Sequence, residues 1–302
     1  MATSPERTAV TIEGHRLVLS NLSKVLYPAA GFHKAEVIDY YVRVAPAMLA
    51  HIADRAVTLR RYPDGPDGES FFEKRCPSHR PEWVPVALGP GDRRGAIAYC
   101  RLDSVAALAW AANLAALEIH APMARCDDIE SPTMVVFDLD PGLPATITEC
   151  CEAALEIAEV LDAVGLRAWP KTSGSKGLQL YVPINGELSH ERASSFAHAV
   201  AQLLERKLPA RITSNMDKAQ RGGRVFIDWS QNSRHKTTVA AYSLRARERP
   251  TVSTPVSWDE VSDGATGTPL AFEAAEVLDR LDRLGDLFAA VTTVRQQLPG
   301  GS

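Results

Sequence analysis

An apolar segment that carries two acids constrains the fold of this chain more than any other stretch. Residues 133–142 read TMVVFDLDPG, and the Pro-Gly pair ends a strand-like run. Because side chains alternate along a strand, Asp138 and Asp140 share one face with Val136, and Leu139 lies on the other. Neighbouring carboxylates repel each other unless a cation lies between them. Their oxygens favour Mg²⁺ or Mn²⁺, and surface acids that cap a turn are the alternative.

A third acid lies in a second apolar strand, residues 224–230, which read RVFIDWS. Burying Asp228 there is costly unless the carboxylate is paired or bound to metal. Three carboxylates from two strands are typical of a two-metal phosphoryl-transfer site. A buried ion pair with a nearby arginine is the alternative for Asp228.

Strand-like and helix-like segments alternate along the 302 residues, which predicts an α/β or α+β fold. The expected helices are residues 33–54 (bent near Pro46), 104–117, 145–164, 189–208 and 270–290. Besides the two acid-bearing segments, the expected strands are residues 56–62, 166–170 and 177–184, after a short N-terminal strand region. Exposed loops are expected at residues 63–70 and 89–94.

The formal charge of -4 means that any nucleic-acid surface must be local. Eleven Lys/Arg against four Asp/Glu lie in residues 205–249, and residues 259–286 are acidic, which indicates an anion-binding face or an unevenly charged surface. Residues 105–117 are too short to span a membrane, and residues 1–16 lack an apolar signal region. We therefore expect a cytoplasmic protein with five reduced cysteines: Cys76, Cys100, Cys126, Cys150 and Cys151.

The loop KTSGSKG, residues 171–177, offers donors for phosphate. Ser173 and its neighbours present backbone N–H and hydroxyl groups, and Lys176 adds a positive charge. The order of glycine and lysine is not that of a Walker loop, and a flexible turn is the alternative. His120 and Arg245 lie near polar stretches elsewhere, although a lone histidine is usually structural.

In this order, these segments resemble one known family, the polymerase domain of bacterial DNA ligase D in the archaeo-eukaryotic primase superfamily. The matching strings are SKVLYP, FFEK, LEIH, FDLDPG, TSGSKGL, LYVP, VFIDWSQNS, KTT and YSLR, over roughly residues 17–260. The resemblance implies two mixed or antiparallel sheets flanked by helices around a central cleft. It also implies one domain over residues 1–302, with a DNA-binding part at about 1–120 and a catalytic part at about 121–290.

The resemblance implies roles for individual residues. Asp138, Asp140 and Asp228 match three catalytic aspartates that hold two divalent cations, Mn²⁺ or Mg²⁺. The positions that match nucleotide-binding residues are His120, Ser173, Lys176, Gln179, Arg221, Gln231 and Arg245. Lys24 and Lys34 match a pair that grips a downstream 5′-phosphate. Phe71 and Phe72 match an aromatic pair at the template end, although strand alternation places one of the two rings in the core.

The implied activity is template-dependent extension of a primer at a short gap or broken DNA end, with ribonucleotides preferred. The implied partners are DNA that carries a 5′-phosphate, nucleoside triphosphates, and a DNA ligase or Ku. A monomer without membrane contact is expected. No ligase or phosphoesterase motif is visible, so the two alternatives are a stand-alone actinobacterial homologue, which we expect, and an excised domain. The alternatives are a metal-dependent phosphoesterase or nuclease, and a catalytically silent DNA-end-binding module.

One position departs from the family pattern. The family has GLHLY where this chain has GLQLY, so Gln179 replaces a histidine. A neutral amide can donate to phosphate but cannot become cationic. We expect Gln179 to face the triphosphate, so that Gln179→His would tighten nucleotide binding, most strongly at low pH.

Overall fold

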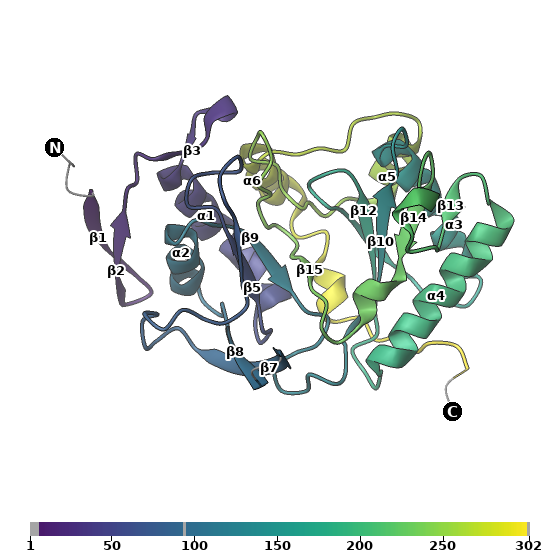
Figure 1. Ribbon diagram of the computed structural model, residues 1–302, viewed down its shortest axis with the longest axis horizontal. Helices are drawn as coiled ribbons and strands as arrows, with labels where there is room; N and C mark the ends of the chain where they lie inside the picture. Colours follow the sequence, from purple (N-terminus) through teal and green to yellow (C-terminus); the bar gives the residue numbers. More distant parts are fainter. Residues whose placement is uncertain (1–5, 93–94, 301–302) are drawn as a thin grey trace.

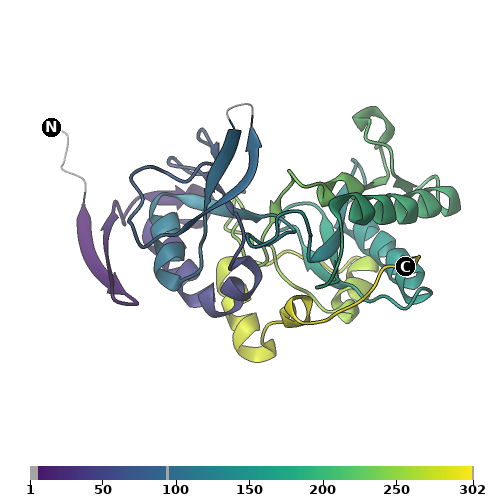
Figure 2. The same cartoon turned by 90° about the horizontal axis from the view of Figure 1, so that it is seen from below.

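The computed structural model describes residues 6–92 and 95–300, which form two lobes side by side (Figure 1). The first lobe contains most of the N-terminal half and is completed by a short strand and the last helix. The second lobe is built from the middle of the chain. Each lobe has its own hydrophobic core, and the N- and C-termini lie at opposite ends of the molecule (Figure 2).

A four-stranded antiparallel sheet in the order β15-β9-β5-β6 lies in the first lobe. Its strands are β5 (Thr58–Arg61), β6 (Phe71–Glu73), β9 (Ala116–Ala121) and β15 (Thr238–Val239). The helical elements of this lobe are η1 (Pro28–Ala30), α1 (Lys34–Ile52), α2 (Val105–Asn113), α6 (Ala274–Leu284) and η4 (Ala289–Thr292). Three hairpins complete it: β1 (Arg7–Ile12) with β2 (His15–Ser20), β3 (Val25–Tyr27) with β4 (Phe32–His33), and β7 (Val86–Asp92) with β8 (Gly95–Cys100).

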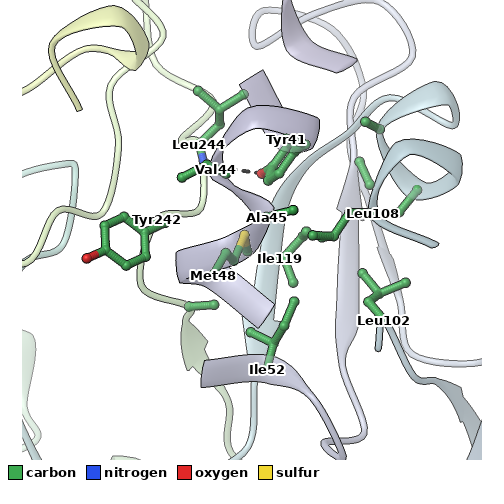
Figure 3. Close-up of a cluster of buried hydrophobic side chains, with 14 of the residues drawn as sticks. Tyr41, Val44, Ala45, Met48, Ile52, Leu102, Leu108, Ile119, Tyr242 and Leu244 are labelled. Atoms are coloured by element: carbon green, nitrogen blue, oxygen red, sulfur yellow. Dashed lines mark hydrogen bonds between the residues drawn. The ribbon is translucent and has the colours of Figure 1, made fainter. Parts of the chain in front are cut away.

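The core of the first lobe fixes the orientation of strand β9. The buried face of α1 packs against the sheet (Figure 3), and the Tyr41 hydroxyl accepts a hydrogen bond from the Leu244 backbone N–H at 3.1 Å. Ile119 on β9 lies fully buried in this cluster. Because side chains alternate along a strand, its neighbours Glu118 and His120 extend from the opposite face.

The second lobe contains a five-stranded mixed sheet in the order β11-β12-β10-β14-β13, in which only β13 and β14 run parallel. Its strands are β10 (Met134–Pro141), β11 (Trp169–Thr172), β12 (Leu178–Pro183), β13 (Ile212–Thr213) and β14 (Val225–Asp228). Its helical elements are α3 (Ile147–Asp162), α4 (His190–Lys207), η2 (Lys218–Gln220), η3 (Trp229–Asn232) and α5 (Trp258–Ala265).

Strand β10 confirms the predicted alternation. Val135, Phe137 and Leu139 are fully buried in the core of the second lobe. Val136, on the opposite face, belongs to the core of the first lobe instead. Asp138 therefore projects from the face that looks toward the first lobe.

The mixed α+β architecture is as predicted, with several small sheets, and some local predictions need correction. The expected helix at 104–117 ends at Asn113, and residues 116–117 lie in strand β9. The expected helix at 270–290 is shorter, and helix α5 was not expected. Residues 89–92 lie in strand β7 rather than in a loop, because this segment pairs with β8 in a hairpin that projects from the first lobe (Figure 2). Residues 93–94 lie outside the described part of the chain.

The prediction of five reduced cysteines is wrong for two of them. Cys76, which follows β6, forms a disulfide with Cys100 at the end of β8. These residues are 24 positions apart in the sequence, and the Cys76 N–H donates to the Ala98 carbonyl on β8 at 2.8 Å, which places Cys76 beside the end of that strand. The free cysteines are Cys126, Cys150 and Cys151. Among the described residues, no helix has both the length and the apolar character needed to cross a membrane.

Candidate active site

Three carboxylates converge where β10 and β14 pair. Asp138 lies directly opposite Asp228 in the antiparallel register, and Asp140 follows on the same face of β10. One oxygen from each carboxylate lies within 4.8 Å of the others. Across residues 6–92 and 95–300, these acids form the one cluster of three or more His, Cys, Asp or Glu that could hold a metal ion.

The electrostatics of this cluster fit a divalent cation. Burial raises the pKa of Asp138, and repulsion from Asp140 raises it further. Burial and the charge of Asp228 likewise raise the pKa of Asp140. Asp228 accepts hydrogen bonds from the Ser230 N–H at 3.0 Å and the Ser230 hydroxyl at 2.6 Å, not from an arginine. Carboxylate oxygens that repel one another are the ligands that Mg²⁺ and Mn²⁺ prefer.

Gln179 contacts Asp138 and Lys171 in this structure, whereas the sequence predicted that it faces the triphosphate. Cross-strand register aligns four polar residues across β11, β12, β10 and β14: Lys171, Gln179, Asp138 and Asp228. The Gln179 Nε2 donates to Asp138 Oδ1 at 2.9 Å, and its Oε1 accepts from the Lys171 ammonium at 2.5 Å. Both ends of the amide are therefore occupied, and the residue is buried.

Lys171 was not identified from the sequence. It is fully buried, and its ammonium also donates to Ser253 Oγ at 2.6 Å and to the Val239 carbonyl at 3.0 Å. An ammonium only donates and a carboxylate only accepts, so the Gln179 amide fits between Lys171 and Asp138 in one orientation. These hydrogen bonds, from Lys171 through Gln179, fix the orientation of the Asp138 carboxylate. Little in the sequence pointed to Lys171, because it stands at the start of the KTSGSKG segment, directly after the strand expected at residues 166–170.

The loop between β11 and β12, which the sequence predicts to bind phosphate, is tightly built. The Ser173 hydroxyl accepts from the N–H groups of Ser175 at 3.2 Å and Gly177 at 3.1 Å, which leaves its own proton free to donate. A Cβ at Gly177 would lie 2.1 Å from the Leu139 carbonyl oxygen, so only glycine allows the loop to approach β10 this closely. Lys176 is exposed at the loop surface.

Two further predicted nucleotide-binding residues border the acids. The Arg221 guanidinium lies 3.6 Å from the centre of the Phe226 ring, and its charge partly offsets the rise in the pKa of Asp140. The Gln231 Nε2 donates to Asp228 Oδ2 at 3.0 Å. Arg221 Nε and Gln231 Oε1 are buried without a hydrogen-bond partner in the described structure. Such atoms commonly mark a place where a ligand or water completes the bonding.

A second polar cluster extends from the first lobe toward the phosphate loop. The buried Glu118 carboxylate accepts from His120 Nε2 at 2.9 Å and from Arg245 Nε at 3.2 Å. Arg245 Nη1 donates to the Ser173 carbonyl at 2.5 Å, which joins this cluster to the loop. Burial lowers the pKa of His120, against the opposing effect of Glu118. Glu118 itself was not singled out from the sequence, although it lies in the LEIH string.

Lys24 and Lys34 lie together but away from the acids. The Lys34 N–H donates to the Lys24 carbonyl at 2.8 Å. Lys24 is half-exposed and pairs with Asp64 at 2.6 Å, whereas Lys34 is buried and donates to the Ser20 carbonyl at 2.7 Å. Burial, with the charges of Lys24 and Arg61, lowers the pKa of Lys34 to about 8. A 5′-phosphate contact for this pair stays a prediction.

Phe71 and Phe72 correct another expectation, because neither ring is in the core. Their exposed fractions are 51% and 58%. Strand β6 is the edge of its sheet. Phe72 lies on the side of the second polar cluster, 4.8 Å from the Arg60 guanidinium and 5.7 Å from the His120 ring.

Comparisons with known proteins identify the family of this chain. A family model described as "LigD, primase-polymerase domain" matches residues 33–288. The chain is 46% identical over 276 residues to the multifunctional non-homologous end joining protein LigD of Mycolicibacterium smegmatis, covering 91% of this chain and 36% of that protein. It is 31% identical over 271 residues to the bifunctional LigD of Bacillus subtilis, covering 89% of this chain and 43% of that protein.

A solved structure matches almost the whole chain. The polymerase domain from Mycobacterium tuberculosis Ligase D, in complex with DNA, superimposes with a TM-score of 0.86 and 42% identity. The match covers 93% of this chain and 99% of that domain, whereas the chain spans only 36% and 43% of the two full-length relatives. With a family model over residues 33–288 and this structural match, the chain belongs to the LigD primase-polymerase family of nucleotidyltransferases.

Proposed function

We propose that this chain adds nucleotides to a primer 3′ end at a short gap or broken end of DNA, as directed by a template. The observation that carries the proposal is the position of three uncompensated carboxylates beside a basic cluster and a phosphate-type loop. Two divalent cations on Asp138, Asp140 and Asp228 would activate the 3′-hydroxyl and stabilise the leaving pyrophosphate. The residues present fit such cations, since all three offer hard oxygen ligands.

The chain's own residues would bind and orient the nucleotide. Ser173, Lys176, Arg221, Gln231 and Arg245 lie around the acids or the loop beside them and would supply donors for the triphosphate, and His120 would contact the nucleotide beside them. Gln179 would act on Asp138 instead. Three further properties rest on family membership: a preference for ribonucleotides, recognition of a downstream 5′-phosphate by Lys24 and Lys34, and service in end joining beside a DNA ligase or Ku. A cytoplasmic monomer is the form in which we propose that it acts.

Incorporation into a gapped duplex tests the proposal. The protein is incubated with a one-nucleotide gap that carries a labelled primer, Mn²⁺ or Mg²⁺, and single nucleoside triphosphates. We expect the primer to lengthen by one residue, only with the nucleotide complementary to the template. A shortened primer would indicate a phosphoesterase or nuclease, and an unchanged primer in a stable complex would indicate a silent end-binding module.

A further inference from the structure

We propose that Glu118 is a positioning residue that holds His120 and Arg245 in place for the incoming nucleotide, an inference that rests on the proposed function. Its side chain is only 1% exposed, yet four donors surround the carboxylate. Oε1 accepts from Arg245 Nε at 3.2 Å and from the Ala246 N–H at 3.1 Å. Oε2 accepts from His120 Nε2 at 2.9 Å and lies 3.5 Å from Arg60 Nη1.

The sheet fixes the position of this carboxylate. In the antiparallel register of β6, β5 and β9, Phe72 lies opposite Arg60, and Arg60 lies opposite Glu118. Ile119 is fully buried in the core of the first lobe, which prevents β9 from rotating (Figure 3). Glu118 and His120, two residues apart on the same face, are therefore held in a fixed mutual position.

The Glu118 carboxylate also determines which atoms of His120 and Arg245 remain free to contact a ligand. A carboxylate only accepts, so His120 must carry its proton on Nε2. His120 Nδ1 is then unprotonated in the neutral ring and free to accept. Arg245 is held at two points, with Nε on Glu118 and Nη1 on the Ser173 carbonyl, so its remaining donors have a fixed direction. One buried acid thus orients two groups at the nucleotide site.

The charges around Glu118 indicate that it does more than neutralise the neighbouring arginines. Glu118 forms ion pairs with both Arg60 and Arg245, so this cluster keeps a positive excess that suits an anionic ligand. Burial alone would raise the pKa of Glu118, but the His120 hydrogen bond and the charge of Arg245 outweigh it and hold that pKa below its usual range. The acid therefore stays ionised, and it accepts from both groups throughout the working pH range.

Two substitutions separate positioning from charge compensation. Glu118→Gln keeps the length but turns a donor toward Arg245 or His120, and Glu118→Asp keeps the charge but withdraws the oxygens. We expect both to raise the KM for the nucleoside triphosphate, the first by about tenfold or more and the second by about threefold or more, with kcat changed less. The Mn²⁺ concentration for half-maximal activity should stay within about twofold, because the acids on β10 and β14 are untouched.

Glu73 provides the matched control on the same sheet. It forms a partly exposed ion pair with Arg61 at 3.0 Å. Its neighbour on β6, Phe72, faces the Glu118 cluster, so Glu73 extends from the opposite face of the strand. Glu73→Gln should leave the KM for nucleotide within about twofold of wild type. A KM near wild type in Glu118→Asp, or an equal rise in Glu73→Gln, would overturn the proposal.

A spectroscopic measurement on the wild-type protein tests the contact between Glu118 and His120 directly. Long-range ¹H–¹⁵N correlation of the histidine rings in the wild-type protein reports the tautomer of His120, with His120→Gln used to assign the signal. We expect the neutral ring protonated on Nε2, and a proton on Nδ1 would contradict the proposed contact. A wild-type protein that shows this tautomer but adds no nucleotide would refute the proposed function and not the Glu118 contact.

Discussion

Each of the two larger sheets carries a row of side chains that lie opposite one another on neighbouring strands, and the acids in the two rows differ in their electrostatic surroundings. On the five-stranded sheet the row ends in Asp138 and Asp228, beside Asp140, and mutual repulsion and burial raise the pKa of Asp138. On the four-stranded sheet the row runs from Phe72 through Arg60 to Glu118. The Glu118 carboxylate lies among cations, and its pKa is lowered. The same type of side chain is thus left uncompensated in one row and compensated in the other.

This difference indicates which ligand charge each row receives. The acid row can be stabilised only by cations, whereas the row at Glu118 has its acid paired and arginine charge to spare. A nucleoside triphosphate with its divalent metals needs both kinds of surface side by side. Arg245 joins them, because it connects Glu118 to the loop beside β10.

Removing an acid from the first row should have the largest effect. Asp138→Ala or Asp228→Ala should reduce incorporation by more than about 1,000-fold, because a metal ligand acts on the transition state, while DNA affinity stays nearly unchanged. Asp162→Asn, an exposed acid at the end of α3, serves as the control. Near wild-type incorporation by either alanine variant would refute the metal assignment.

Removing the exposed ring at the end of the second row should have the next largest effect. Stacking of a template base on Phe72 is worth about 1–3 kcal/mol, so Phe72→Ala should weaken binding to gapped DNA by roughly 5- to 150-fold. Phe71→Ala, on the other face of the strand, should cost less. Fluorescence anisotropy measures the affinity, and thermal melting should show little change for either variant, since both rings are exposed. Equal affinity losses would refute the assignment of Phe72 to the template side.

Lys34 predicts a pH dependence outside both rows. Its lowered pKa, about 8, means that the free ammonium is charged at pH 7 and largely neutral at pH 9. The preference for a gap with a 5′-phosphate should therefore fall as pH rises through this range, by up to about tenfold per unit. Lys34→Arg keeps its charge and should flatten the profile. A wild-type preference that is constant from pH 7 to pH 9 would argue against a phosphate contact for Lys34.

Gln179→His should have the smallest effect. A neutral imidazole can donate to Asp138 with one nitrogen and accept from Lys171 with the other, as the amide does. Nucleotide Kd at pH 6 and pH 8 should thus change by less than about threefold. Gln179→Glu provides the contrast, because it turns a carboxylate toward Asp138 and should raise the Mn²⁺ requirement. Nucleotide binding that tightens strongly at pH 6 in Gln179→His would restore the triphosphate contact expected from the sequence.

Sequence patterns predicted the side-chain directions that depend on a single strand, and they missed the contacts that depend on two segments of the chain. Alternation placed Asp138 and Leu139 on opposite faces correctly, because a period of two is a property of the strand alone. Lys171 acts through its cross-strand neighbour Gln179, and Glu118 holds Arg245, which is 127 positions away in the sequence. Neither contact can be read from one strand by itself. Alternation also predicted one buried ring at Phe71–Phe72, but both rings are exposed on the edge strand β6.

Titration with Mn²⁺, followed by electron paramagnetic resonance of the free ion, tests the contrast between the rows most directly. The wild-type protein should bind Mn²⁺, Asp228→Asn should lose most of that binding, and Glu118→Gln should bind as wild type does. This measurement needs neither DNA nor nucleotide, so it reports the acid row alone. Wild-type Mn²⁺ binding by Asp228→Asn, or a comparable loss in Glu118→Gln, would contradict the division of cation and anion sites between the two sheets.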